Sequence, residues 1–432
     1  MSEVTRRSFL QTSAGAVAAT TLLTGAARAD VNSKIRIAVL GVNGRGKTHI
    51  NAIGEIEGAD VVLLCDPDEQ VLAKRAAEFE KKYGRKVETE TDMRKVFDRD
   101  DIDVVTVATP NHWHSLATIW ACQAGKDVYV EKPGSHNLFE GRKMIEAAKK
   151  YKRIVQHGVQ LRSQPAIQEG VEHLRKGTIG DVYMARGLVF RWRPSIGHKP
   201  DEKAPAYLDW NLWQGPAQET NFSQRYVHYN WHWTWDYGNG DVGNQGVHET
   251  DMCLWGLDVK LPSQITAMGG KFLWDDDKVT PEVLSTNYFY PEENKMIQFE
   301  VRPWITNEEG GASVGNIFYG SEGYMVVKGY NSYEIFLGRK GEPGPKNSGG
   351  DPVVPHFTNF LNAVRSRKAE TLNGPVETAH TSSGIAHLGN IAFRLGRQLN
   401  FDPKTEQFVN DAEADQYLTR EYREPFVVPN EV

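Results

Sequence analysis

The first third of the chain alternates apolar runs with segments of helical periodicity, and this pattern restricts its fold more than any other feature. "KIRIAVLG" (34–41), "ADVVLLCDPD" (59–68), "DVVTVATP" (103–110) and "DVYVEKP" (127–133) are almost continuously apolar until they end. Strands that are apolar on both sides must be covered on both faces, and helices between them supply that cover. The sequence therefore predicts an α/β fold that begins with a doubly wound parallel sheet, the Rossmann arrangement.

From about Asp181 the pattern changes to alternating strand-like runs with few helices between them. "VYMARGLVFRW" (182–192), "SQITAMGGKF" (263–272) and "LSTNYFY" (284–290) are examples. Alternation of this kind is typical of an antiparallel sheet with one face on the core. We therefore predict a second, α+β domain around one large, mainly antiparallel sheet that is open on one face, followed by helices and a polar arm at residues 401–432.

A glycine-rich turn, "GVNGRG", follows the first strand. Gly41, Asn43 and Gly46 occupy the three positions that are glycine in the usual dinucleotide fingerprint, with Gly44 and Arg45 between them. The turn follows a strand and opens a helix whose N-terminal amides would face phosphates. Asn is the non-glycine residue that best tolerates a left-handed conformation, so the exchange at Asn43 weakens the motif without breaking it. The turn predicts a dinucleotide site that includes all five of these residues.

Asp66, at the end of the second apolar run, indicates which dinucleotide binds. Its carboxylate is placed to accept hydrogen bonds from both ribose hydroxyls of an adenosine, and its charge would repel a 2′-phosphate. NAD is therefore expected, with NADP the less favoured cofactor. The alternative role for Asp66 is a helix cap before the following "PDEQV".

The N-terminus resembles a cleaved twin-arginine export signal. Arg6 and Arg7 precede a short, mildly apolar stretch from Ala14 to Ala27, which ends in the small-x-small triplet Ala27–Ala29. The stretch is too short to span a membrane, so no stable membrane insertion is expected after cleavage. A frayed helix would not explain the arginine pair together with the triplet. The resemblance implies a periplasmic protein that is exported already folded.

Composition limits the classes of molecule that the protein is expected to bind. The net charge is −6, and neither a basic block nor a basic amphipathic helix occurs, so nucleic acid is not expected as a partner. The three cysteines lie far apart in apolar segments and are expected to be small buried side chains. Five of the 11 tryptophans fall within residues 210–235. They would stack on sugar rings or form a bulky core under a long loop, and the sequence leaves both roles open.

Three later motifs, "ATPNHWH" (108–114), "EKP" (131–133) and "GNQGVHETD" (243–251), resemble those of the Gfo/Idh/MocA oxidoreductases. The resemblance implies a Rossmann domain, a second domain whose open sheet covers the nicotinamide, and assembly through that sheet into homodimers or homotetramers. It also implies site residues. Pro110, Asn111 and His114 would line the cofactor, Glu131 and Lys132 would lie beside the nicotinamide ribose, His248 would face the substrate, and Gln160 and Arg162 would lie where the chain enters the second domain.

Physical arguments support roles for Lys132 and His248. Lys132 follows a strand and should emerge at the carboxyl edge of the sheet, where it can hydrogen-bond a hydroxyl and stabilise alkoxide charge. On a helix, His248 would share a face with Asn244 and Asp251. An imidazole suits proton removal near neutral pH. The alternative is a structural histidine bonded to a backbone carbonyl.

Asn244 departs from the family pattern, which usually has an aspartate four residues before the histidine. Lys132 would then lack a carboxylate partner there, and either Asp241 or Asp236 replaces it or the chemistry differs. His228 and His232 are four residues apart, so on a helix both could bind one metal ion. The aromatic residues between them favour a substrate-stacking loop instead, and no metal is expected. The expected substrate contacts are Trp231, His232, Trp233 and Asp251.

Three hypotheses for function remain. The first is an NAD(P)-dependent oxidoreductase that acts on a secondary hydroxyl of a sugar, polyol or glycoside and holds its cofactor tightly, since free NAD would be scarce outside the cytoplasm. The second is an NAD-dependent glycoside hydrolase that works by oxidation, elimination, water addition and re-reduction. The third is a non-catalytic sugar-binding protein.

The predicted parts are the signal (1–29), the NAD-binding Rossmann domain (30–155), an α+β domain for substrate and oligomerisation (156–375), and a C-terminal helix and arm that pack back on the Rossmann domain (376–432).

Overall fold

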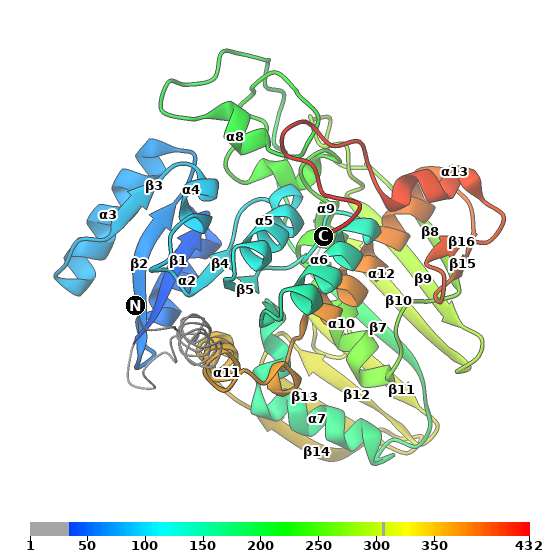
Figure 1. Cartoon of the computed structure of the whole chain (residues 1–432). Coiled ribbons are helices and arrows are strands. Elements are labelled where there is room, and N and C mark those ends of the chain that lie inside the picture. Colours follow the sequence, from blue (N-terminus) through cyan, green and yellow to red (C-terminus); the bar gives the residue numbers. More distant parts are fainter. Residues whose placement is uncertain (1–33, 305–306) are drawn as a thin grey trace, which may run out of the picture. The chain divides into compact units, whose positions relative to one another are not determined.

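The computed structural model describes residues 34–304 and 307–432, of which Ile35–Val432 form one compact unit. The first part of this unit is a six-stranded parallel sheet with the order β3-β2-β1-β4-β5-β6 (Figure 1). The strands are β1 (Ile35–Leu40), β2 (Ala59–Cys65), β3 (Glu88–Glu90), β4 (Val104–Val107), β5 (Asp127–Val130) and β6 (Val155–His157). The predicted Rossmann sheet is confirmed, and the sequence pattern missed only its two three-residue edge strands.

Both faces of this sheet are covered, as its apolar strands require. Along β1, Ile37 and Val39 belong to one buried cluster, and Ala38 and Leu40 belong to another on the opposite face. The first cluster is closed by α2 (Arg45–Ile53), α3 (Glu69–Tyr83) and α11 (Val353–Ser366), and the second by α4 (Met93–Phe97), α5 (Asn111–Gln123) and α6 (Leu138–Lys150). Thus α11, which lies within the segment predicted for the second domain, packs on the first sheet.

The second part is a ten-stranded sheet with the order β14-β13-β12-β11-β7-β10-β9-β8-β15-β16. Every pairing in it is antiparallel except that of β7 with β10, so the predicted large, mainly antiparallel sheet is confirmed. Its strands are β7 (Val182–Phe190), β8 (Gln264–Gly270), β9 (Val283–Tyr290), β10 (Lys295–Arg302), β11 (Val314–Gly320), β12 (Gly323–Lys328), β13 (Ser332–Leu337), β14 (Glu342–Ser348), β15 (Leu399–Asp402) and β16 (Gln407–Phe408).

One face of this sheet carries the main core; the other is open along β8 and β9 but holds a small buried cluster at β7, β11 and β12 that includes Leu188, Ile317 and Val326. The core cluster includes apolar residues of α7 (Pro165–Arg175), α10 (Gly246–Leu257) and α12 (Val376–Leu395). On the open face, Met268 of β8 is 82% exposed and Phe289 of β9 is 38% exposed. Assembly of two or four copies through this face stays a prediction.

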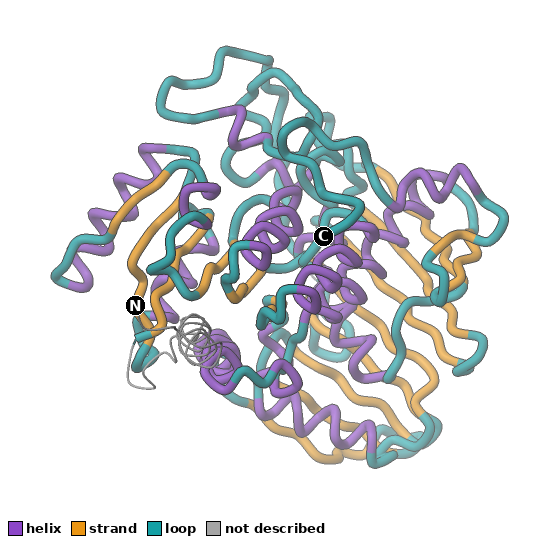
Figure 2. The backbone as a smooth tube through the Cα atoms, in the orientation of Figure 1, coloured by secondary structure: helices purple, strands orange, loops and turns teal. Residues whose placement is uncertain are grey.

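A long, mostly irregular segment, residues 191–239, links β7 to the helices that follow (Figure 2). It contains the short helices α8 (Trp210–Gln214) and η2 (Asn230–Trp233), and α9 (Gly240–Asn244) follows it. Its backbone bonds to the first sheet's loops, because the amide of Glu69 donates to the carbonyl of Tyr207 at 2.9 Å and the amide of Asp209 donates to that of Pro67 at 3.0 Å. This segment therefore covers the carboxyl edge of the parallel sheet.

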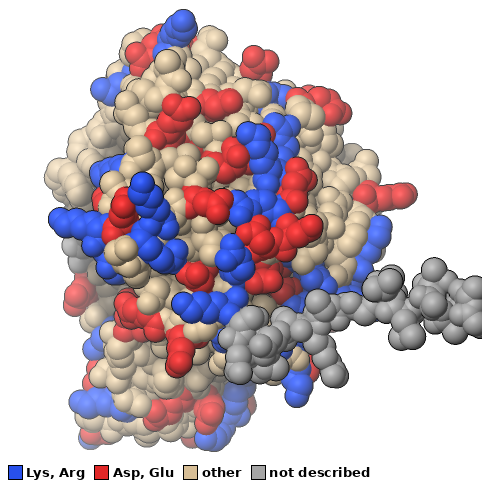
Figure 3. Space-filling view, turned by 60° about the vertical axis from the view of Figure 1, so that its left-hand side comes forward, with Lys and Arg blue, Asp and Glu red and all other residues tan. Residues whose placement is uncertain are grey.

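The C-terminal part of the chain also returns to the first sheet. Helix α12 packs against both α6 and α10. Beyond it, Phe426, Val428 and Val432 lie in the apolar cluster of α5 and α6, where Figure 1 shows the chain end. On the face drawn in Figure 3, Lys and Arg side chains lie interspersed with Asp and Glu. Among the described residues, no helix has the length and apolar character needed to cross a membrane.

Candidate active site

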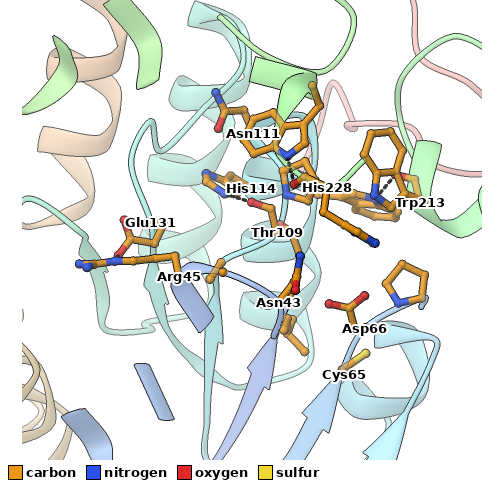
Figure 4. Close-up of a pocket in the computed structure, with 18 of the residues that line it drawn as sticks. Asn43, Arg45, Cys65, Asp66, Thr109, Asn111, His114, Glu131, Trp213 and His228 are labelled. Carbon is orange, nitrogen blue, oxygen red and sulfur yellow. Dashed lines mark hydrogen bonds and ion pairs between the residues drawn. The ribbon is translucent and has the colours of Figure 1, made fainter. Parts of the chain in front are cut away.

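A cavity of about 290 Å³ lies over the carboxyl ends of β1, β2, β4 and β5, where open α/β sheets bind their ligands. Residues 212–232 of the irregular segment form its opposite wall. Figure 4 shows Arg45 and Glu131 on one side, Asp66 on the other and Asn43 between them. Since β1 and β4 separate β2 from β5, the two sides are three strand spacings apart, or about 14 Å.

Most of the predicted site residues line this cavity. They are Gly41, Asn43, Gly44, Arg45, Asp66, Pro110, Asn111, His114, Glu131, Lys132, Trp231, His232 and Asn244. Six others do not reach it: Gly46, Gln160, Arg162, Trp233, His248 and Asp251. The other thirteen lining residues include Thr109 and Tyr229, which no sequence pattern indicated, and Trp213 and His228, which the sequence suggested for other roles.

The glycine turn brings backbone close to backbone. Gly41 has a φ of 79°, and a Cβ there would lie 2.7 Å from the carbonyl oxygen of Ala108. A Cβ on Gly46 would lie 1.9 Å from the carbonyl oxygen of Gly41, so helix α2 can approach the strand only with glycine there. Asn43 is not among the residues with positive φ, so a tolerance for the left-handed region does not explain its place. Gly44 precedes α2 without a side-chain cap, which leaves the first amides of the helix free for an anion.

Arg75 of α3 holds this turn from outside the cavity. Its Nε donates to the carbonyl of Val42 at 2.8 Å, and Nη2 donates to the carbonyl of Asn43 at 2.7 Å. The guanidinium is buried and also pairs with Glu78. No sequence pattern indicates this contact, because a helix arginine usually faces solvent.

Asp66 is fixed by the backbone rather than by a cation. Its Oδ2 accepts from the amide of Val42 at 2.9 Å, and its Oδ1 accepts from the amide of Asp68 at 3.1 Å. Burial raises the pKa of this carboxyl to about 6, so it is mostly ionised at pH 7. The cap of α3 is Asp68, which accepts from the amides of Gln70 and Val71. The alternative role of Asp66 as the helix cap is therefore wrong, and its carboxylate faces the cavity.

His228 extends from the irregular segment to the same side. Its Nε2 lies 3.2 Å from Oδ2 of Asp68, so the segment is anchored to the loop that carries Asp66. This contact accounts for His228 without a metal ion.

On the other side of the cavity, the carboxylate of Glu131 contacts two basic side chains, Arg45 and His49. Its Oε1 lies 2.7 Å from Nε of Arg45 and 3.0 Å from Nε2 of His49. Burial alone would raise the pKa of Glu131, but the charges of Arg45 and His49 hold it well below its usual range. Glu131 is therefore an ionised part of the cavity wall.

Lys132 follows Glu131 and reaches across to the second domain. Its Nζ donates to the backbone carbonyl of Asn244 at 2.6 Å and lies 3.5 Å from that residue's Oδ1. Burial lowers the pKa of Lys132 to about 8. Neither proposed replacement carboxylate bonds to it: Asp241 pairs with Arg193 through two bonds of 2.7 Å, and Asp236 lines a different cavity. Lys132 thus contacts an amide side chain and a backbone carbonyl.

His248 lies behind this part of the cavity. It is buried on α10, its ring packs edge-on against that of Tyr330 with centroids 5.1 Å apart, and its Nδ1 has no partner among the described residues. Burial and the nearby Lys132 charge hold the pKa of His248 well below its usual range. One turn along α10 from Gln245, Glu249 is buried, and burial raises its pKa to about 8, so its carboxyl is mostly protonated at pH 7.

Asp251 and Arg162 pair with each other instead of with a ligand. Nε of Arg162 lies 2.8 Å from Oδ2 of Asp251, and Nη2 lies 2.9 Å from Oδ1. Ser382 also donates to this carboxylate, at 2.5 Å. Asp251, predicted to contact the substrate, does not line the cavity, and its pair with Arg162 ties the entry of the second domain to α10. Gln160 is buried at the start of the short helix η1 (Gln160–Ser163).

The first turn of α5 closes the cavity between the two sides. His114 places its ring nitrogens 2.6 Å from the carbonyl of Pro133 and 2.8 Å from that of Thr109, so it connects the ends of two strands. Asn111 donates to Oδ1 of Asn239 at 3.2 Å.

The tryptophan-rich segment forms the buried core that was one of its two expected roles, while stacking on sugar rings stays a prediction. Trp213 and Trp231 belong to a buried aromatic cluster, which confirms the core under a long loop, yet both also line the cavity. Trp231 stacks on His232 with ring centroids 3.6 Å apart. Trp233 is buried outside the cavity beneath Arg193.

Two models of one protein family match the chain. The model described as an oxidoreductase family with an NAD-binding Rossmann fold matches residues 35–159, and that described as the oxidoreductase family's C-terminal alpha/beta domain matches residues 181–279 and 347–428. Together they cover more than half of the chain.

Curated relatives match over shorter stretches. A levoglucosan dehydrogenase from Pseudarthrobacter phenanthrenivorans is 29% identical over 226 residues, 51% of this chain and 50% of that protein. A glycosyl hydrolase family 109 protein from Shewanella sp. strain ANA-3 is 33% identical over 120 residues, 27% of this chain and 26% of that protein. The chain thus spans only a quarter to a half of these relatives.

Solved structures resemble the whole fold. A levoglucosan dehydrogenase in complex with NADH and levoglucosan has a TM-score of 0.65 and 17% identity, covering 85% of this chain and 99% of that chain. An aldose–aldose oxidoreductase from Caulobacter crescentus with glycerol has the same TM-score and identity, covering 85% and 100%. From the two family models, which include the predicted motifs, the chain belongs to the Gfo/Idh/MocA family of oxidoreductases.

Proposed function

We propose that this protein is an NAD-dependent oxidoreductase that acts on a secondary hydroxyl of a sugar, polyol or glycoside. One observation carries the proposal: a single cavity has a carboxylate, Asp66, on one side and a lysine of lowered pKa, Lys132, on the other. That separation suits a dinucleotide whose phosphates meet the glycine turn midway between its nucleosides.

The residues present fit such a cofactor. Gly41 and Gly46 let the turn and helix α2 pack closely on the strand ends, and the free amides at the start of α2 suit a pyrophosphate. Asp66 would accept the adenosine ribose hydroxyls, and its charge favours NAD over NADP. Nη2 of Arg45, which has no partner among the described residues, is available to the phosphates or to the second ribose. When bound, NAD supplies the acceptor for a hydride.

Lys132 would accept the proton of the substrate hydroxyl and return it. With a pKa of about 8, roughly one-tenth of its side chains are neutral at pH 7, which suits a group that accepts a hydroxyl proton and returns it. Asn244 orients the ammonium through its carbonyl. His248 is uncharged behind the wall and acts as a positioning residue, because it does not line the cavity.

A sugar is the substrate class that the wall favours. The stacked pair of Trp231 and His232 gives the cavity an aromatic surface beside polar groups. Aromatic faces pack against the apolar C–H face of a sugar ring, and hydroxyls satisfy the polar groups around it. The structurally similar levoglucosan dehydrogenase and aldose–aldose oxidoreductase agree with this class.

We also propose that the cofactor stays bound between turnovers. The irregular segment covers the Asp66 side through His228 and the backbone bonds of Tyr207 and Asp209. Retention would suit a protein exported in the folded state, as the paired arginines Arg6 and Arg7 predict. That signal lies outside the described residues, so its function and the periplasmic location remain proposals.

A second candidate is a glycoside hydrolase that oxidises a hydroxyl, eliminates the glycosidic substituent, adds water and returns the hydride. It is favoured by Asn244, which replaces the usual acidic residue next to Lys132, and by partial identity to family 109 glycosyl hydrolases. In this scheme Lys132 again removes and returns the hydroxyl proton.

Two absorbance measurements on the purified protein separate these functions. The protein is incubated with free sugars and with nitrophenyl glycosides while reduced nicotinamide and nitrophenol are followed. Lasting reduced nicotinamide with free sugars supports the oxidoreductase. Nitrophenol release without net reduced cofactor supports the hydrolase. Binding of sugar with neither signal, and no difference between wild type and Lys132→Met, would overturn both in favour of a non-catalytic binding protein.

A further inference from the structure

A second cavity, of about 370 Å³, lies on the other side of the segment that walls the first one. It is bounded by α12, by the loop around His136, and by residues 416–421 of the C-terminal arm. Ligand cavities in proteins usually begin at about 300 Å³, so its size suits a small molecule. None of the catalytic residues proposed for the first cavity lines it.

Two buried polar side chains of α12 lie in the wall of this cavity, each with one unpartnered atom. Asn390 is 5% exposed; its Nδ2 donates to the carbonyl of Asn239 at 2.9 Å, while its Oδ1 has no partner among the described residues. His387, one turn before it on α12, is 4% exposed; its Nε2 lies 3.1 Å from Oγ of Ser135, and its Nδ1 is likewise unpartnered. Both unpartnered atoms are covered from solvent, so they add polarity to the wall without reaching the cavity themselves.

An arginine held between aromatic rings completes the wall. The guanidinium of Arg394 lies 5.1 Å from the ring centroid of Trp235 and 4.5 Å from that of Tyr417. None of the side-chain hydrogen bonds or ion pairs found within the described residues uses this guanidinium, so its N–H groups are free to donate to a ligand. Nearby, Asp236 is exposed and also lines the cavity, where it offers an acceptor.

The mixture of groups identifies the class of ligand. A carboxylate or phosphate would meet the cations Arg394 and Arg420 but also the carboxylates of Asp236 and Glu421, all of which line the cavity. Each hydroxyl of a sugar both donates and accepts, and the partly buried face of Trp235 suits the C–H side of a sugar ring. We propose that this cavity is a second binding site, specific for a neutral saccharide unit and separate from the cavity that contains Lys132.

The two cavities share a wall. Asn239 accepts from Asn111, which lines the first cavity, and its own Nδ2 donates to the carbonyl of His136 at 3.1 Å in the second. The same segment presents Trp231 to the first cavity and Trp235 to the second. The two cavities therefore adjoin, yet they have no lining residue in common.

The proposal is tested by calorimetry and crystallography on the full chain saturated with NAD. The probes are D-glucose, D-galactose, N-acetyl-D-galactosamine and methyl β-D-glucoside at millimolar concentrations, with D-glucuronate and inorganic phosphate as anionic counterparts. We expect at least one neutral probe to occupy the second cavity. Trp235→Leu and, separately, Arg394→Met should each raise its Kd at least tenfold. Because Arg394 is exposed, its substitution leaves the core intact.

Two controls keep this test independent of the proposed enzyme activity. Lys132→Met should leave binding in the second cavity unchanged, whether or not the protein turns a substrate over. Trp192→Leu, which removes a half-exposed tryptophan outside both cavities, should also leave it unchanged. Electron density for the neutral probes in the first cavity alone would overturn the proposal, as would binding of only the anions, or equal binding by wild type and both cavity variants.

Discussion

The two sides of the first cavity are built in different ways. On the Asp66 side, the carboxylate is fixed by the amides of Val42 and Asp68, and the residues come from consecutive strand ends of one sheet. On the Lys132 side, the ammonium reaches a carbonyl of Asn244, 112 residues away. The amides that fix the Asp66 carboxylate come from neighbouring parts of the first sheet, whereas Lys132 gains its partner only when two distant parts of the chain meet.

This difference separates binding from chemistry. Burial raises the pKa of Asp66 to about 6, so its carboxyl is mostly ionised at pH 7 and above, including the range in which Lys132 titrates. Burial lowers the pKa of Lys132 to about 8 and raises that of Glu249 to about 8, so the other side titrates close to working pH. Groups poised in this way are suited to proton transfer.

The largest expected effect comes from Lys132→Met. Loss of the group that transfers the proton should lower kcat by about 10²- to 10⁴-fold. The amount of bound NAD should stay the same, because the adenosine and phosphate contacts lie elsewhere. Turnover and cofactor content are measured on the same preparation. The control is Lys126→Met, which removes another buried lysine. Lys126 lies outside the cavity lining and donates to the carbonyl of Arg99, so this variant should keep full turnover. Loss of cofactor together with turnover would show that the two sides are not separate.

Asp66→Asn should weaken cofactor binding and leave turnover at saturating NAD nearly unchanged, the reverse of Lys132→Met. It removes charge-assisted bonds to ribose worth about 1.5–3 kcal/mol each, so Kd for NAD should rise about tenfold or more, while kcat at saturating NAD stays near that of the wild type. Loss of the charge should also reduce the preference for NAD over NADP. Kd values for both cofactors, from fluorescence titration, measure this. Unchanged affinity for NAD would contradict the role assigned to Asp66.

The pH dependence of rate should follow Lys132. For oxidation, the neutral amine accepts the proton, so kcat/KM should rise as pH increases through about 8; for the reverse reduction, the ammonium donates, so kcat/KM should fall over the same range. Rates in both directions, measured from about two pH units below this pKa to about two above it, test this. A profile that runs the same way in both directions would rule out Lys132 as the proton carrier.

The smallest effect is expected in Glu249→Gln. Because the folded-state pKa of Glu249 is raised from 4.5 to about 8, the folded state binds more protons than the unfolded state between these values, and the stability of the wild type falls as pH rises through them. Gln cannot ionise, so the variant should gain in Tm relative to the wild type as pH rises over this range, on the order of a few degrees. Affinity for NAD should not change. A difference in Tm that stays constant with pH would mean that the pKa of this carboxyl is not raised.

The sequence could predict the Asp66 side because each of its parts follows a strand within a recognisable βα unit. Gly41, Gly44 and Asp66 all line the cavity as expected. The apolar runs likewise predicted the central strands, whereas β3 and β6 are too short to show a period.

The other side could be predicted only in part. Spacing on a helix placed His248 and Asp251 beside Asn244, but it could not show that Arg162 pairs with Asp251 or that His248 is packed under Tyr330. The contacts of Arg75 and Tyr229, and the contact of His228 with Asp68, could not be predicted because they join segments distant in sequence, and no local pattern encodes such contacts.

A crystal structure of the full chain with NAD would show whether the cavity is divided into a side that binds and a side that reacts. We predict that the adenosine ribose hydroxyls bond to Asp66, that the pyrophosphate lies on the amides of Gly44 to Gly46, and that the nicotinamide ring lies beside Lys132. A cofactor bound in the opposite direction, or one whose nicotinamide lies away from Lys132, would contradict this division.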